Sequence, residues 1–482
     1  MKEKINLLKF IELKKISSFF CCAGLLVGLG FLSVYVRPLY IFGFLGVLIL
    51  AFIIFTNPWR GVLLLAFFLP FERLGAYDFA GITIRPSQIA GVLTILALIF
   101  YYSVRRKFPI PKNPLLIPLG GFVVVMLLGF LNAPNFSRSL MVFAFTLFTI
   151  AIGFTLPFLL NSEKKVKQLL AFFFAAYLLV TIFGLYQFIG DYLGLPQALT
   201  GLRDLYVKDV LGFPRVQSTA LEPLYFANYL LVPLSILLSL FLNKEKTYSS
   251  LFTFGLLVLG VVNLLLTVAR GGYIAFAVSF LLIVLYYFLE LKLITWRNVG
   301  IAFVSFLVAG GILVKMVGLE TVSQDFLGHV SNLFGGASYN ERVEMFTIAY
   351  QAWQDHPIIG IGAGSFGPYE AAHPNYMREV EGWRIVNNEY LELLAENGIV
   401  GLVLIMIVFI IVLLRSIKAL KETSSDFIRT VLLGALAGFI GILVQYNTFS
   451  VLYIMHIWFT VGFLIALQNL ALKNASYDSS HF

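Results

Sequence analysis

Long apolar runs separated by short polar segments occupy almost the whole of this sequence. Runs close to the roughly 20 residues that cross a bilayer begin at about positions 17, 38, 60, 86, 114, 138, 167, 221, 249, 272, 298, 399, 427 and 450. This pattern predicts an all-α fold, a polytopic transmembrane helix bundle of about 14 helices. Because the run near 60 is short and is broken by Pro70, the expected range is 12–14. We expect residues 1–482 to form a single membrane domain.

Lysine and arginine residues collect at every second connection between these runs. Cytoplasmic loops carry such an excess of positive charge, so all the clusters are expected on the cytoplasmic side, together with both chain termini. The odd-numbered connections then face outward. The clusters lie at residues 2–15, 105–112, 164–167, 244–246, 292–297 and 415–429.

Composition excludes several classes of protein. Hydrophobic residues make up 60% of the chain and charged residues 12%, which is too apolar for an ordinary water-soluble core. The net charge of +9 comes mainly from the clusters at the membrane connections, so nucleic acid is not an expected partner. The only cysteines, Cys21 and Cys22, are adjacent within the first apolar run and support neither a disulfide framework nor a zinc site.

No sequence motif indicates a metal site, a nucleotide phosphate site or a nucleophile elbow, so we expect no cofactor. A G-x-G-x-x-G spacing occurs at Gly362, Gly364 and Gly367, but no βαβ unit with a downstream acidic residue accompanies it. We therefore give this match no weight as a dinucleotide site.

Two outward connections are long, residues 191–220 and 318–390, and long connections in compact proteins are usually functional or disordered. Within the second, SYNERVEMFTIAYQAW (338–353) has the apolar spacing of an amphipathic helix. The glycine-rich stretch HPIIGIGAGSFGP (356–368) then breaks the helix. We expect residues 318–390 to form a large, partly helical extracytoplasmic loop.

Four arginines lie on the predicted outer side. Arg270 is the most informative, because it lies where two apolar runs meet and charge at membrane depth is costly without a partner. The adjacent Gly271 and Gly272 allow a substrate to approach closely, and the planar guanidinium suits a phosphate or diphosphate. The four are Arg215, Arg270, Arg342 and Arg384.

Each of these charges also has a structural interpretation. Arg270 could snorkel to lipid phosphates. Arg215 could pair with Glu222 and fix the loop, and Arg342 could pair with a nearby carboxylate on a solvated helix face. The residues alone leave these alternatives open.

The stretch VNNEYLELLAENG (386–398) places carboxylates at i, i+3 and i+7, namely Glu389, Glu392 and Glu396. They could carry chemistry or form the wet face of a short surface helix that Gly398 ends, and we favour the wet face for Glu392.

Among the five histidines only His373 is outward and close to this stretch, and it is our candidate general base. His356 is expected to end the loop helix, and His456 to be a buried, hydrogen-bonded side chain in the last apolar run.

Residues 340–415, which contain HPIIGIGAGSF and NNEYLELLAENGIVGL, carry a family resemblance, supported by TVARGG (267–272) and FPRVQSTALEPLYFANYL (213–230). The chain resembles the O-antigen ligase and O-antigen polymerase superfamily of bacterial membrane glycan transferases. Before residue 200 the resemblance rests on hydropathy alone.

The resemblance implies a location in the bacterial cytoplasmic (inner) membrane and a donor glycan linked to undecaprenyl diphosphate, used on the outer face of that membrane. The acceptor would be another glycan, a lipid such as the lipid A core, or a protein, and other polysaccharide-assembly proteins are possible partners. Where the family commonly has histidine, this sequence has Asn387. Asparagine cannot act as a general base, which favours a polymerase-like enzyme over a ligase.

The outward charges and the family resemblance together predict the residues of the site. We expect Arg215 and Arg270 to bind the diphosphate and Arg342, Arg384 and Asn387 to contact sugars, with His373 or Glu389 as the catalytic base. Glu222 is a further candidate substrate-binding residue. The alternatives are a ligase acting on a lipid or protein acceptor, a transporter of lipid-linked glycan, and a structural partner in an envelope assembly. A transporter is expected to show midplane charges, broken helices or an inverted repeat.

Overall fold

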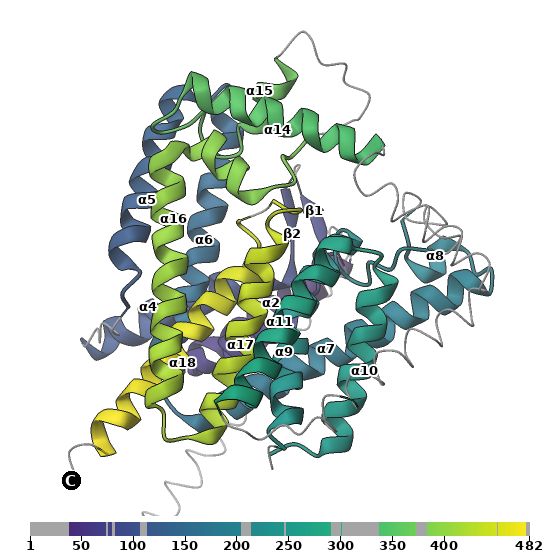
Figure 1. Cartoon of the computed structure of the whole chain (residues 1–482), viewed down its shortest axis with the longest axis vertical. Coiled ribbons are helices and arrows are strands. Elements are labelled where there is room, and N and C mark those ends of the chain that lie inside the picture. The colour runs from purple at the N-terminus through teal and green to yellow at the C-terminus, as the bar shows by residue number, and fades with distance from the viewer. Residues whose placement is uncertain are drawn as a thin grey trace, which may run out of the picture.

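A computed structural model (Figure 1) describes residues 38–73, 76–79, 82–106, 113–203, 214–244, 247–290, 300, 337–372, 383–450 and 452–478. Two of the fourteen predicted apolar runs, near 17 and 298, begin outside these ranges. Each of the other twelve is a helix in the structure. Eight of the described helices are long and apolar enough to cross a membrane, and four shorter apolar helices accompany them.

The predicted helical fold is therefore confirmed over the described residues, while the total of 14 stays a prediction. The helices are α2 (Pro38–Thr56), α3 (Pro58–Phe68), α4 (Pro86–Arg105), α5 (Leu116–Gly129), η1 (Phe130–Asn132), α6 (Phe136–Leu159), α7 (Glu163–Tyr192), α8 (Gln197–Thr200), α9 (Pro223–Leu242), α10 (Ser250–Leu266), α11 (Arg270–Leu289), α14 (Ala337–Asp355), α15 (Phe366–Ala371), α16 (Glu389–Glu422), α17 (Asp426–Gln445) and α18 (Met455–Asp478).

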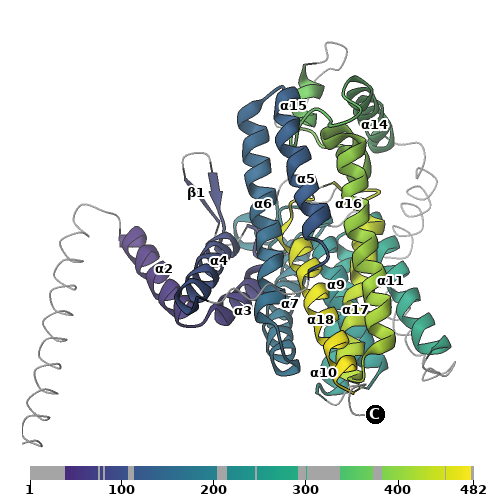
Figure 2. The same ribbon diagram turned by 90° about the vertical axis from the view of Figure 1, so that its left-hand side faces the viewer.

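One antiparallel hairpin departs from the predicted all-α fold. Strand β1 (Tyr77–Phe79) pairs with β2 (Ile82–Ile84), with Tyr77 opposite Ile84. Strands of three residues are too short to show a period-2 pattern within an apolar sequence, which is why hydropathy overlooked them. The hairpin lies between α3 and α4 in the chain and projects above α4, beside α6, in Figure 2.

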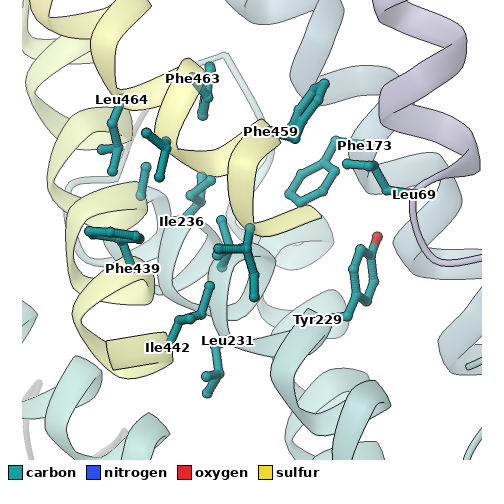
Figure 3. Close-up of a cluster of buried hydrophobic side chains, with 14 of the residues drawn as sticks. Leu69, Phe173, Tyr229, Leu231, Ile236, Phe439, Ile442, Phe459, Phe463 and Leu464 are labelled. Carbon is teal, nitrogen blue, oxygen red and sulfur yellow. The ribbon is translucent and has the colours of Figure 1, made fainter. Parts of the chain in front are cut away.

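The centre of the bundle is formed by α9, α17 and α18, and Figure 3 shows their apolar side chains meeting, among them Leu231, Ile442 and Phe463. Small residues bring the backbones together, as is common for helices packed in membranes. A Cβ atom on Gly438 of α17 would lie 2.7 Å from the Cα of Val232 on α9. A Cβ on Gly462 of α18 would lie 1.9 Å from the carbonyl oxygen of Gly153 on α6.

Helices α14 and α15 and the first turns of α16 form a cap at the end of the bundle opposite the chain's C-terminal end (Figures 1 and 2). The predicted amphipathic helix over 338–353 is confirmed as α14, whose Met345 and Ile348 are buried while Tyr350 is exposed. These side chains pack with Phe366 and Val386 in a small apolar cluster of the cap. The cap therefore has its own core.

Helix α16 links the cap to the bundle and is interrupted at Gly398, where φ is +63°. A Cβ there would lie 2.3 Å from the carbonyl oxygen of Ile358, so glycine is required both by the backbone angle and by the close approach. The main-chain N–H of Ile399 donates to the carbonyl of Pro357 (2.9 Å) instead of continuing the helix. The prediction that Gly398 ends a short helix is confirmed, because the helical backbone stops at Gly398 and a second helical segment of α16 begins after it.

We expect Gly462→Ala to destabilise the protein, because the added methyl group would meet the Gly153 carbonyl at the α6–α18 crossing. The loss is expected to be about 1–3 kcal/mol, seen as a lower thermal unfolding midpoint in detergent. Gly255→Ala in α10 is the matched control, since no heavy atom lies within 4 Å of its added Cβ. There, better helix propensity predicts an unchanged or higher midpoint, and equal losses in both variants would contradict the argument.

Candidate functional site

The segment between α17 and α18 contains a loop, residues 446–450, that holds the beginning of α16. The main-chain N–H of Glu389 donates to the carbonyl of Tyr446 (2.8 Å), and the N–H of Asn387 donates to the hydroxyl oxygen of Ser450 (3.0 Å). The phenolic hydroxyl of Tyr390 donates to the carbonyl of Leu443 (2.7 Å), near the end of α17. These bonds place Asn387 directly over the 446–450 loop.

The same loop contacts the beginnings of two other helices. The ring of Phe449 lies 4.8 Å from that of Tyr225 in the first turn of α9, in an edge-to-face arrangement. Thr448 packs against Gly271 at the start of α11, where a Cβ would lie 2.0 Å from its hydroxyl oxygen. The 446–450 loop therefore adjoins the N-terminal ends of α9, α11 and α16, which begin beside Glu222, Arg270 and Asn387.

Arg215 reaches this region through the segment 214–222. Its Nε donates to the carbonyl of Thr267 (3.4 Å), and the N–H of Val216 donates to the carbonyl of Leu266 (2.9 Å). Both acceptors belong to the turn from α10 to α11, at whose end Arg270 begins α11. The predicted pair Arg215 and Arg270 is thus attached to one short turn.

The remaining charges at this end affect one another. Burial, followed by the nearby charge of Arg270, lowers the pKa of Arg342 on α14. The side chain of Glu222 reaches solvent, but surrounding protein removes part of its hydration, and this desolvation raises the pKa of Glu222. The positive charges of Arg203 and Arg215 lower the same pKa. We call Arg203, Arg215, Arg270 and Arg342 the arginine cluster. Clustered cations of this kind favour a multiply charged anion.

Sequence analysis overlooked Glu72, which lies beside the segment 214–222. One of its carboxylate oxygens accepts the N–H of Leu221 (3.2 Å), and its carbonyl accepts Nε of Arg85 (2.9 Å). Burial raises the pKa of Glu72 to about 7, although the Leu221 bond and the Arg85 charge lower it and the Glu222 charge raises it. A carboxylate in a connection that was predicted to face outward, in so apolar a chain, was the signal that could have identified it.

The glycine-rich stretch binds a carboxylate of the chain itself. Glu396 accepts the N–H of Gly364 (2.7 Å) and of Phe366 (2.9 Å), with Gly362 and Gly364 at φ of +95° and +68°. Nε of Arg138 donates to the Gly364 carbonyl (2.6 Å). Successive N–H groups that point at one anion form an anion-binding nest, and here the anion is an internal side chain.

The wet-face interpretation that we favoured for Glu392 was wrong, because its carboxylate faces a cavity and is bonded within the protein. Glu389 and Glu396 are 3% and 8% exposed, and with Glu392 they line a cavity of about 30 Å³ between α16 and the bundle. Glu392 accepts the N–H of Val386 (2.9 Å) and the hydroxyl of Ser450 (2.5 Å). Helical periodicity groups these residues on one face, but it does not say whether that face meets water or the interior.

The other predicted site residues lie apart from the arginine cluster or beyond the described chain. Arg384 forms an ion pair with Glu370 (3.8 Å) inside the cap, which favours a structural role. His373 lies outside the described residues. His356 follows the last residue of α14, and His456 is buried with Nε2 2.6 Å from Oδ1 of Asn228, as predicted for both. Across the described ranges no three His, Cys, Asp or Glu side chains are placed to hold a metal ion.

Residues 255–406 match the family model described as O-antigen ligase. The resemblance to this superfamily is confirmed, and the domain supports a membrane glycan transferase of the ligase or polymerase type. An uncharacterized protein of Haemophilus influenzae is 24% identical over 237 residues, which cover 46% of this chain and 58% of that protein. With the eight candidate spanning helices, these findings support a multi-pass bacterial membrane protein.

We expect the stability of the protein to fall as the pH rises from about 4.5 to about 7. In this window the folded chain holds a proton on Glu72 that the unfolded chain has released, so the unfolded state gains with rising pH. The change is up to about 3 kcal/mol and levels off above pH 7. Thermal unfolding midpoints measured from pH 5 to 8 check it.

Glu72→Gln should reduce this slope, whereas Glu341→Gln, on the exposed side of α14, should keep the wild-type slope. An identical slope in wild type and Glu72→Gln would show that another group is responsible.

Proposed function

We propose that this chain, as the bearer of an O-antigen ligase domain, transfers glycans from undecaprenyl diphosphate on the outer face of the cytoplasmic membrane. The observation that supports the proposal is that the 446–450 loop contacts both Gly271, next to Arg270, and the main chain of Asn387, while Arg215 bonds to the α10–α11 turn that leads to Arg270. The cap formed by α14 and α15 lies at the same end. The product would be a surface polysaccharide such as O-antigen, capsule or exopolysaccharide.

The reaction we propose is a direct displacement. An acceptor hydroxyl oxygen attacks the anomeric carbon of the donor glycan, and the new C–O bond replaces the bond to the diphosphate oxygen. The hydroxyl proton passes to a base, and undecaprenyl diphosphate leaves with the bonding electron pair. Negative charge therefore grows on the diphosphate, and preorganised cations stabilise the transition state more than the ground state.

Arg215 and Arg270 are the proposed diphosphate ligands. Arg215 bonds to the α10–α11 turn and Arg270 follows that turn, so their main chains are held near each other, and a guanidinium offers paired N–H donors to phosphate oxygens. Arg342 approaches Arg270 from the cap and would add a third positive charge. Glu222 would orient Arg215 and Arg203 through their mutual attraction.

His373 and Glu389 remain our proposed bases, and Asn387 a ligand for a sugar hydroxyl. The burial of Glu389 beneath the 446–450 loop means that it would act only on a proton delivered to the cavity it lines. Asn387 lies at the surface of the same loop and can donate and accept hydrogen bonds without changing its protonation. Arg384 we assign to holding the cap, through Glu370.

The acceptor defines the type of enzyme. We favour a polymerase, in which the acceptor is a second lipid-linked glycan, because Asn387 replaces the histidine that the family commonly carries. A ligase would use a lipid or protein acceptor instead. A transporter of lipid-linked glycan is the second class of function, and it would move the donor without breaking the bond to the diphosphate.

We expect purified protein in detergent to convert an undecaprenyl-diphosphate-linked oligosaccharide into lipid-linked products of higher mass. Arg270→Ala should lower the transfer rate about 100- to 1,000-fold, because a charge-stabilising donor is lost, and Arg270→Lys should fall between Ala and wild type. Arg60→Ala, an exposed arginine of α3, is the control and should retain the wild-type rate. Product mass is followed by mass spectrometry.

The products distinguish the candidate functions. A ladder of repeat multiples indicates a polymerase, and transfer of one unit only after a distinct acceptor is added indicates a ligase. If the donor stays chemically unchanged under every condition but is moved across the membrane of vesicles, the protein is a transporter and the proposed enzyme activity is excluded. Full activity in Arg270→Ala would exclude the proposed diphosphate site.

The proposed orientation is tested by cysteine labelling in a background lacking Cys21 and Cys22. Gln354→Cys at the exposed end of α14 should react with a membrane-impermeant maleimide in spheroplasts. Ser424→Cys in the α16–α17 connection should react only after lysis. The reverse pattern would place the cap on the cytoplasmic side.

A further inference from the structure

We propose that Glu392 and Ser450 are positioning residues that fix the main chain of Asn387 and direct its carboxamide toward the substrate. The inference rests on the proposed function, and it concerns how this site replaces the histidine that the family commonly carries. It gives a role to two residues that hold Asn387 through its main chain and do not touch the substrate themselves.

The hydrogen bonds among these residues have only one consistent direction. The N–H of Asn387 can only donate, so the hydroxyl oxygen of Ser450 accepts it (3.0 Å). The hydroxyl hydrogen is then free to donate, and it does so to Oε2 of Glu392 (2.5 Å). The same carboxylate oxygen accepts the N–H of Val386 (2.9 Å). Glu392 thus holds two consecutive residues, one directly and one through Ser450.

The surroundings make this arrangement rigid. Ser450 and Val386 are fully buried, and Glu392 comes from the first turn of α16, whose start is tied to the 446–450 loop. Buried polar groups that are fully hydrogen-bonded specify one geometry, because any alternative leaves a donor or acceptor unpaired. The position of the Asn387 main chain is therefore set by α16 and by the loop together.

The held conformation is an uncommon one. Asn387 has a φ of +57°, in the left-handed region that asparagine tolerates better than most residues but that still costs free energy. The next residue, Asn388, is extended and caps α16 by accepting the N–H of Leu391 (3.1 Å). The two asparagines thus have different tasks, and the left-handed turn at Asn387 separates them.

The carboxamide of Asn387 is left for a ligand. Within the described part of the chain, no group forms a hydrogen bond with this carboxamide, and the contacts of Asn387 are made through its main-chain N–H. Strain held by neighbouring residues at a polar side chain without a protein partner is typical of a substrate contact. The clasp, which we define as Glu392, Ser450 and the main chain of residues 386–387, would keep this contact in place.

A structural role and a positioning role give different kinetics, and a double-mutant cycle separates them. Asn387→Gly removes the carboxamide while glycine accepts the same φ without strain. Ser450→Ala removes the hydroxyl that both accepts and donates in the clasp, and Glu392→Leu removes the carboxylate oxygen that accepts both of its bonds. With the lipid-linked oligosaccharide as donor, we expect each to lower kcat about tenfold and to change KM by less than twofold.

In the Asn387→Gly background the same two changes should have no further effect on kcat, since the group they position is gone. Ser450→Cys, nearly isosteric but a weaker hydrogen-bonding group, should give a smaller fall and serves if Ser450→Ala does not fold. Asn447→Ala, an exposed change in the same loop, should keep the wild-type kcat.

The inference is overturned if Ser450→Ala and Glu392→Leu leave kcat unchanged in otherwise wild-type protein. It is also overturned if they lower kcat as much in the Asn387→Gly background, because their role is then only structural. Absence of transfer by the wild type is a different result, since it removes the proposed function and with it the premise of the cycle.

Discussion

The hydrogen bonds of the 446–450 loop are the constraint on which the arrangement at this end of the bundle depends. A helix begins with N–H groups that no residue of the helix can accept, and in an apolar surrounding each of them needs a partner. At the start of α16 the carbonyl of Tyr446 accepts the first of these N–H groups, that of Glu389, and the hydroxyl of Ser450 accepts the N–H of Asn387, two residues before the helix. Contacts of the same five residues with α9 and α11 then determine where Glu222 and Arg270 lie relative to Asn387.

The bundle itself could be predicted from the sequence because its cause is local. An apolar run of sufficient length forms a helix in a bilayer whatever its neighbours, since only a helix satisfies the backbone there. The break at Gly398, the amphipathic α14 and the buried His456 were likewise visible in single residues or short periods. The β1–β2 hairpin was not, because three-residue strands depend on their pairing rather than on a pattern.

The candidate site was only partly predictable, because its geometry depends on contacts between distant segments. Arg215 and Arg270 could be singled out as charges that the topology does not require. No property of the sequence, however, indicated that Glu72 lies against Leu221, or that Ser450 lies against Glu392. The carboxylates of residues 386–398 show this limit of sequence-based prediction most clearly. Their spacing correctly predicted that they share one helix face, but it did not predict that this face lines a cavity inside the protein.

The bond between Glu396 and the glycine-rich stretch has a consequence for ligand selection. The backbone N–H groups of Gly364 and Phe366, which could bind an anion, already donate to the carboxyl group of Glu396. A phosphate from solution would have to compete with a carboxylate at a very high effective concentration, and would leave that carboxylate buried without its donors. Among the described residues, this stretch of backbone is therefore closed to free anions, because its donors are already used by the protein itself.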